Sequence, residues 1–165
     1  MDCEPPITIG TKTNIFYNEL LLSEIRVLPM NMYEALGGEA KVRELAYRFY
    51  DVMDEMPEAA TIRAMHREEL GEIKELLFEF LSGWFGGPPL FIMRRGSPCL
   101  NKQHRPFPID ETARDQWMQC MDKAMEDVGI PQNLQEMLRP AFFQLADVIR
   151  INAEKAKAKE NLSEH

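Results

Sequence analysis

Apolar side chains recur every three or four residues along most of this chain, which is the pattern of helices that bury one face. The clearest stripe covers residues 73–84 and ends at Gly86-Gly87-Pro88-Pro89, where a helix cannot continue. Similar stripes predict helices over residues 42–53, 117–128 and 134–149. No segment shows a convincing period of two, so the pattern predicts an all-α protein.

The same pattern divides the chain into three parts. Residues 1–29 form an N-terminal extension with a predicted helix that docks on the domain or on a partner; its apolar face is Ile15, Phe16, Leu20 and Leu21. Residues 30–152 form the helical domain, and Pro140 is expected to kink or divide its last helix. The Lys-, Ala- and Glu-rich tail of residues 153–165 loses the apolar stripe and is expected to fray.

The stretch from Pro88 to Pro108 contains five prolines and holds only short helical pieces. A long ordered loop inside a compact domain is usually functional, which draws attention to its single histidine, His104.

Composition narrows the classes of function. The chain has 165 residues, 45% of them apolar and 28% charged, as expected for one soluble domain. Its 19 basic and 27 acidic side chains give a net charge of −8, which disfavours nucleic acid and anionic membranes as partners. No run is apolar enough to span a membrane, and the first residues do not resemble a secretory signal, so the expected location is the cytoplasm.

The motifs that are missing exclude several chemistries. The three cysteines form no CxxC pair, which disfavours a zinc site, a cysteine-held cluster or covalent haem attachment. The sequence also lacks GxSxG, both common phosphate loops and a calcium loop. A site that uses one histidine remains possible, such as an iron porphyrin. His104 stands before the stiff Arg105-Pro106-Phe107-Pro108; if one ring nitrogen donates to a backbone carbonyl or another acceptor, Nε2 stays free for a metal. The alternative is an ordinary histidine on a surface loop.

Five segments, in order, strengthen the porphyrin interpretation. They are Tyr33-Glu34-Ala35-Leu36-Gly37-Gly38, Arg48-Phe49-Tyr50, Phe80-Leu81-Ser82-Gly83-Trp84-Phe85-Gly86-Gly87-Pro88, His104-Arg105-Pro106-Phe107-Pro108-Ile109, and Arg114-Asp115-Gln116-Trp117-Met118-Gln119-Cys120-Met121. With them the chain resembles the truncated haemoglobins of group II, or O-type, from about residue 32 to about residue 150. The resemblance implies a two-over-two helical sandwich around haem, here with an extra N-terminal helix.

The resemblance also implies roles for individual residues. His104 matches the proximal iron ligand, and Tyr50, Trp117 and His66 match the polar groups on the ligand side. The apolar wall of the cofactor site would comprise Ile73, Leu77, Phe80, Phe91, Leu100, Phe107 and Ile109. Relatives often have an arginine where this chain has Gln103, so Arg95, Lys102 or Arg105 is expected to hold a haem propionate in its place.

Each of these residues has a simpler interpretation. Tyr50 and Trp117 are compatible with ordinary core packing, as are the apolar residues of the predicted wall. His66 has three alternatives: it donates to bound dioxygen, occupies the sixth iron position, or points into solvent.

The leading hypothesis is a protein with non-covalent haem b that binds dioxygen, CO and NO. Peroxidase-like or nitric-oxide-consuming activity and a reductase partner are compatible with it. One alternative is a haem-based gas sensor that uses residues 1–29; another is a cofactor-free helical interaction module. The N-terminal helix is also a candidate for oligomerisation.

Overall fold

The computed structural model describes residues 31–96 and 100–163, and every regular element in these ranges is a helix. The elements are α1 (Met32–Leu36), α2 (Gly38–Glu55), the short 3-10 helix η1 (Pro57–Ala59), α3 (Ala60–Arg63), α4 (Gly71–Trp84), α5 (Leu90–Arg95), α6 (Leu100–His104), α7 (Glu111–Asp127) and α8 (Gln132–Ser163). The prediction of an all-α fold is confirmed. The predicted N-terminal helix lies outside the described residues, so it stays a prediction.

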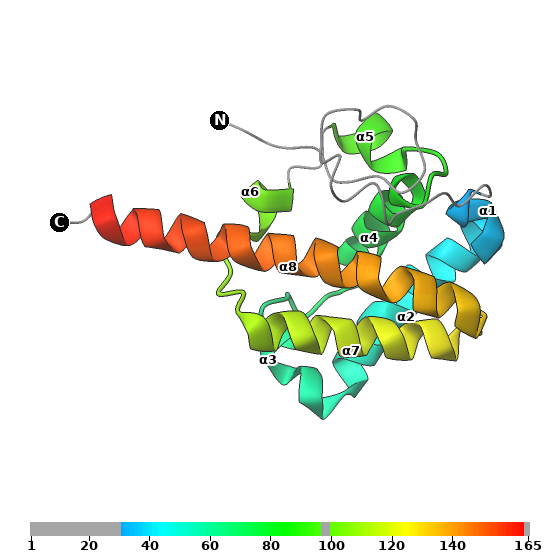
Figure 1. The fold of residues 1–165 in the computed structure, drawn as a ribbon, viewed down its shortest axis with the longest axis horizontal. Coiled ribbons are helices and arrows are strands. Elements are labelled where there is room, and N and C mark those ends of the chain that lie inside the picture. The colour runs from blue at the N-terminus through cyan, green and yellow to red at the C-terminus, as the bar shows by residue number, and fades with distance from the viewer. Residues whose placement is uncertain (1–30, 97–99, 164–165) are drawn as a thin grey trace.

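Two helix pairs form the two layers of the fold. Helices α2 and α4 pack together, α7 and α8 run antiparallel to each other, and α2 also packs against α7 (Figure 1). Aromatic side chains fill the space between the layers: the ring of Phe142 lies 4.9 Å from that of Trp84 and 5.7 Å from that of Trp117. The stripes that predicted these helices therefore form a common core.

A tight contact anchors α1 to the end of α4. Asn31 caps α1 by accepting a hydrogen bond from the backbone N–H of Tyr33, and its amide donates to the carbonyl oxygen of Gly86 at 2.6 Å. The N–H of Tyr33 also donates to the carbonyl oxygen of Phe85 at 3.0 Å. The Tyr33 ring then lies directly over Gly87, where a Cβ atom would overlap with it. Gly87 is thus needed for this close approach.

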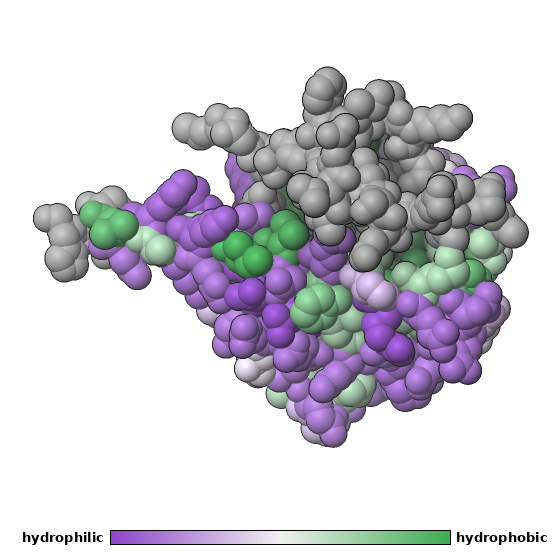
Figure 2. All heavy atoms as spheres, in the orientation of Figure 1, coloured by the Kyte–Doolittle hydropathy of each residue, from purple (hydrophilic) through white to green (hydrophobic). Residues whose placement is uncertain are grey.

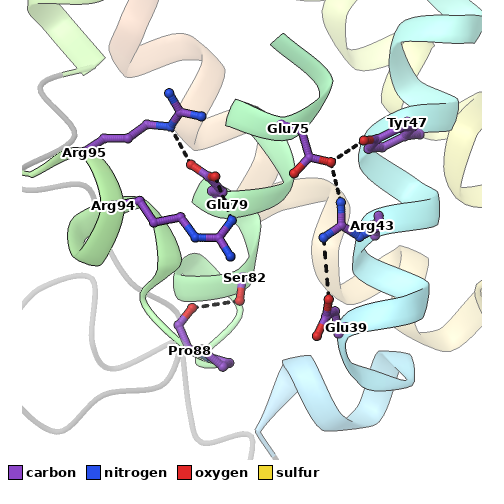
Figure 3. Close-up of polar contacts among 9 residues, drawn as sticks. All are labelled: Glu39, Arg43, Tyr47, Glu75, Glu79, Ser82, Pro88, Arg94 and Arg95. Atoms are coloured by element: carbon purple, nitrogen blue, oxygen red, sulfur yellow. Dashed lines mark hydrogen bonds and ion pairs between the residues drawn. The ribbon is translucent and has the colours of Figure 1, made fainter. Parts of the chain in front are cut away.

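Ion pairs hold the helices of the first layer in register. Glu75 of α4 accepts hydrogen bonds from both Arg43 and Tyr47 of α2 (Figure 3). Lys74, the residue before Glu75 on α4, forms a 2.6 Å ion pair with Asp51, one turn after Tyr47 on α2. Because these partners are part-buried, the contacts position the helices as well as adding a modest stabilisation.

A buried carboxylate joins α4 to α5. The side chain of Glu79 is 3% exposed, and it accepts hydrogen bonds from Arg95 at 2.6 Å and from Arg94 at 3.0 Å (Figure 3). Burial alone would raise the pKa of Glu79, but the hydrogen bonds and positive charges of the two arginines lower it further than burial raises it. The carboxylate therefore stays charged and stabilises the α4–α5 junction.

Helix α8 differs from two expectations. It is one helix of 32 residues that continues through Pro140, so the predicted division is wrong. Pro140 is exposed, and water can reach the carbonyl group of Glu136 that lacks its helical partner. The tail does not fray after residue 153: helix continues to Ser163, because Ala, Lys and Glu are strong helix formers and Arg150 pairs with Glu154 one turn on. Despite this length, none of the described helices is apolar enough to cross a bilayer.

Replacing Gly87 with alanine should destabilise the fold by about 1–3 kcal/mol, because the new methyl group displaces the Tyr33 ring and with it α1. The control is Gly71→Ala, since a Cβ atom at Gly71 meets nothing within 4 Å. Denaturant unfolding of both variants measures the difference. Equal stability of the two variants would contradict the proposed contact.

Replacing Glu79 with glutamine should reduce the free energy of unfolding near neutral pH by about 1–3 kcal/mol. Because the pKa of Glu79 is lowered by folding, its contribution is present above the ordinary carboxyl value of 4.5 and is lost as the pH falls through the folded pKa. The difference between wild type and variant should therefore shrink on acidification. Glu72→Gln, an exposed position of the same helix, is the control; a difference that does not change with pH would refute this role.

Candidate functional site

A cavity of about 250 Å³ lies between the helix layers. Its lining brings together nearly all the residues singled out from the sequence: Tyr50, His66, Ile73, Leu77, Phe80, Phe91, Leu100, His104, Phe107, Ile109 and Trp117. These residues come from α2, from the segment after α3, and from helices α4, α5, α6 and α7 and the segment after α6. The fold thus gathers side chains that are up to 67 positions apart in the chain, from Tyr50 to Trp117.

His104 is the last residue of α6, and its ring is oriented by its own helix. Its Nδ1 atom lies 2.7 Å from the carbonyl oxygen of Leu100, one turn earlier. A carbonyl oxygen only accepts, so Nδ1 carries the proton and Nε2 keeps a free lone pair. Burial lowers the pKa of His104, the bond to Leu100 raises it, and nearby His66 lowers it further, with a net decrease. His104 is therefore a neutral imidazole with the nitrogen that metals prefer left free.

Tyr50 and Trp117 supply polar hydrogens to the cavity. Tyr50 is 6% exposed, and burial raises the pKa of its hydroxyl well above the ordinary value, which keeps it protonated. Among the described residues, neither the Tyr50 hydroxyl nor the Trp117 indole N–H has a hydrogen-bond partner. Asp110 accepts from the backbone N–H of Ala113 at 2.8 Å and so caps α7, the helix that presents Trp117. Both donors remain available to a ligand.

His66 also lines the cavity, which disfavours the alternative in which it points into solvent. Its ring lies 5.5 Å from that of Tyr50, and its Nδ1 is 2.7 Å from the carbonyl oxygen of Ile62. Burial lowers the pKa of His66, the bond to Ile62 raises it and Arg63 lowers it, with a net decrease. The neutral ring therefore presents a lone pair at Nε2 and no proton, which makes it an acceptor and a poor donor.

The apolar wall is incompletely covered by protein. Phe78 of α4 is fully buried, whereas Ile73, Leu77 and Phe80 on the cavity side of the same helix are only half-buried. A row of large apolar side chains facing a cavity is costly in water and favours an apolar occupant.

The structure does not bring Arg95 into this cavity. Its guanidinium group is bound to Glu79, away from the lining, and the alternative Arg105 pairs with Glu160 at 3.0 Å. The basic side chain that does line the cavity is Arg114, which is held by Asp147 at 2.8 Å. Arg114 precedes Trp117 by three residues, and that helical spacing was the available signal for placing both on one face.

The sequence did not predict the remaining residues of the cavity wall, because its pattern indicated at most that they are core positions. They are Ile62, Met65, Leu76, Leu81, Gln103, Ala113, Leu145, Ala146 and Ile149. Helical periodicity identifies which face is apolar, but it does not say whether that face meets another helix or a cavity.

Comparison with known proteins agrees with this geometry. The family model of bacterial-like globins matches residues 31–151. The group 2 truncated hemoglobin YjbI of Bacillus subtilis (strain 168) is 34% identical over 106 residues, which cover 64% of this chain and 77% of that protein. Two solved structures are similar over nearly their whole length.

The first is the cold-adapted truncated hemoglobin of the Antarctic marine bacterium Pseudoalteromonas haloplanktis TAC125, with 45% identity, a TM-score of 0.70 and coverage of 73% of this chain and 97% of that one. The second is the group II 2-on-2 hemoglobin of Agrobacterium tumefaciens, with 35% identity, a TM-score of 0.70 and coverage of 76% and 98%. The chain therefore belongs to the bacterial-like globins and, among them, to the group II truncated, two-on-two haemoglobins.

Membership of this family implies haem as cofactor and a small diatomic molecule as ligand. The residues of the cavity fit that group: half-buried apolar side chains are available for a flat apolar ring, and His104 offers a free Nε2. Arg114 in the wall carries a positive charge, but Asp115 and Asp147 already pair with it.

Proposed function

We propose that this protein binds haem b non-covalently through His104 and binds dioxygen beside Tyr50 and Trp117. The proposal is supported by one observation: the same apolar cavity contains a free acceptor nitrogen and two free hydrogen-bond donors. His104 has its proton committed to Leu100 and its Nε2 free, whereas the hydroxyl of Tyr50 and the indole N–H of Trp117 have no partner among the described residues.

His104 would hold haem through its free Nε2, and the bound haem would supply an iron that binds a diatomic ligand. The contribution of the chain is to orient these groups. The carbonyl group of Leu100 fixes the tautomer and the direction of the His104 ring. Tyr50 directs its O–H group, and Trp117 its N–H group, at a ligand that gains negative charge. Burial strengthens the hydrogen bonds that these groups donate, because little water competes for them.

His66 has a different role in this proposal. Because its Nδ1 proton is held by Ile62, its Nε2 presents a lone pair that suits a ligand for the sixth iron position before dioxygen binds. We favour this role over the donor role that the sequence also allowed.

The same donors suit other diatomic ligands and further chemistry. CO and NO are diatomic molecules about as large as dioxygen, so the same cavity suits them. Donors that stabilise negative charge also favour O–O cleavage, so peroxidase-like and nitric-oxide-consuming activities belong to this proposal. Nitric-oxide consumption would require a reductase partner to return electrons, and peroxidase-like activity would require a reducing co-substrate. A cofactor-free interaction module would leave the apolar cavity and its two unpartnered donors without a role.

Replacing His104 with alanine should abolish stable haem binding. Loss of an outer partner of a metal ligand already weakens metal binding roughly 10–100-fold, and loss of the ligand itself should cost more. The measurement is titration with haemin, followed by the Soret band, with His66→Ala as the control that keeps the proximal nitrogen. Equal haem affinity for wild type and His104→Ala would refute the assignment.

Replacing Tyr50 with phenylalanine should speed dioxygen release roughly 10–100-fold, since a hydrogen bond to a charged group is worth about 1.5–3 kcal/mol. The release rate is measured by rapid mixing with CO. Tyr47→Phe is the matched control, because Tyr47 lies on the same helix and its hydroxyl is bound to Glu75. An unchanged release rate in Tyr50→Phe would count against its role as a donor.

A further inference from the structure

Gln116 of α7 makes two hydrogen bonds to α3. Its Oε1 atom accepts from the backbone N–H of Ile62 at 3.1 Å, and its Nε2 atom donates to Oγ1 of Thr61 at 3.2 Å. Because a backbone N–H only donates, the amide oxygen has to face Ile62, which fixes the orientation of the side chain. Both ends of the Gln116 amide are thus used to hold α3, which packs against α7 (Figure 1).

Helix α3 needs a hydrogen-bond acceptor from outside. It has only four residues, and the first N–H groups of a helix have no acceptor within it. A side chain at the N-cap usually accepts from the second or third of these groups, but the N-cap residue here is Ala59, which has no polar side chain. Ile62 is the third residue of α3, so Gln116 accepts from a group that a local cap would bind. Gln116 therefore acts as the cap of α3 from another helix.

The residue that Gln116 binds is also the one that orients His66. The carbonyl oxygen of Ile62 lies 2.7 Å from Nδ1 of His66. The backbone N–H of His66 donates to the carbonyl oxygen of Arg63, the last residue of α3, at 3.0 Å. Because both of these contacts are with α3, a displacement of α3 would carry the imidazole with it.

Arg63 ties the residues after His66 to the same helix. Its guanidinium group donates to the carbonyl oxygens of Arg67 at 3.0 Å and of Glu68 at 3.2 Å. It also pairs with Asp54 of α2 at 2.7 Å, but the side chain of Asp54 is 59% exposed, so this ion pair stabilises the segment little. The part-buried bond from Ile62 to Gln116 is then the contact that fixes α3 against the cavity.

We propose that Gln116 is a positioning residue of the candidate site, which caps α3 and so holds His66 in the cavity. Gln116 directly precedes Trp117 on α7, and both Trp117 and His66 line the cavity. One turn of α7 therefore sets the position of a hydrogen-bond donor and, through Ile62, the position of an imidazole. The consequence for ligand binding rests on the proposed function, in which His66 competes for the sixth iron position.

Hydrogen exchange of the full chain tests the cap with haem bound or without it. In Gln116→Leu the backbone N–H groups of Ile62 and His66 should exchange roughly fivefold faster, as expected for the loss of a helix cap. Gln116→Asn, whose amide is one carbon too short to reach Ile62, should have the same effect. Gln116→Glu keeps an acceptor for Ile62, and the hydroxyl of Thr61 can turn to donate to it, so this variant should exchange as the wild type does.

The matched control for this exchange experiment is Gln119→Leu, at an exposed position of the same helix. It should leave the exchange of both N–H groups unchanged. Unchanged exchange in Gln116→Leu and Gln116→Asn, or a loss of protection in Gln116→Glu, would overturn the proposal.

A double-mutant cycle with CO tests whether Gln116 acts through His66. After flash photolysis of the haem-loaded chain, CO should rebind at least about threefold faster in Gln116→Leu than in the wild type, because a displaced His66 competes less for the iron. His66→Ala should also speed rebinding, and adding Gln116→Leu to it should change the rate by less than about twofold.

Equal effects of Gln116→Leu with and without His66, or no effect when His66 is present, would refute the positioning role. A wild-type chain that takes up no haem would contradict the proposed function instead. The exchange of the Ile62 and His66 N–H groups would still decide whether Gln116 holds this segment.

Discussion

The hydrogen bond from His104 to the carbonyl oxygen of Leu100 decides what the cavity can bind. It commits the Nδ1 proton at 2.7 Å and leaves Nε2 as a lone pair in apolar surroundings. His66 makes the same kind of bond to Ile62, so two neutral imidazoles present acceptors to one cavity. The hydrogen-bond donors then have to come from elsewhere, and Tyr50 supplies one of them.

On α2 and α4, an ion pair lies next to a residue that lines the cavity. On α2, Asp51 follows Tyr50 and pairs with Lys74 of α4. On α4, Glu79 precedes Phe80 and is bound by two arginines of α5. Exposed ion pairs contribute little to stability, but a buried carboxylate such as Glu79 restricts how its helix can sit, because an unpaired charge there would be costly. The electrostatic contacts thus serve the geometry of the cavity.

Helix α8 connects this geometry to the surface. One side of it contributes Leu145, Ala146 and Ile149 to the cavity wall, and its other side exposes Met137, Val148 and Leu162. A single helix therefore borders both the candidate site and the solvent, and Figure 2 shows apolar as well as polar surface along its outer side. Its C-terminal extension is helical because its residues favour a helix locally, without a core to support them.

The sequence by itself determined the position of the four main helices and the end of α4. Glycine and proline at residues 86–89 stop α4, Asp110 starts α7, and the apolar periodicity shows which face each helix buries. These are local effects of backbone conformation and capping, so they can be read without knowing the neighbours. Even the importance of His104 followed from its place in a proline-rich stretch.

The tertiary structure alone decided which side chains meet. Arg95 and Arg114 both lie near predicted site segments. Their local sequence does not indicate that Arg95 pairs with Glu79 whereas Arg114 lines the cavity. The proton positions on His66 and His104 likewise depend on which carbonyl lies within reach. A side chain chooses its partner by distance in the folded molecule, and only the packing of the helices sets that distance.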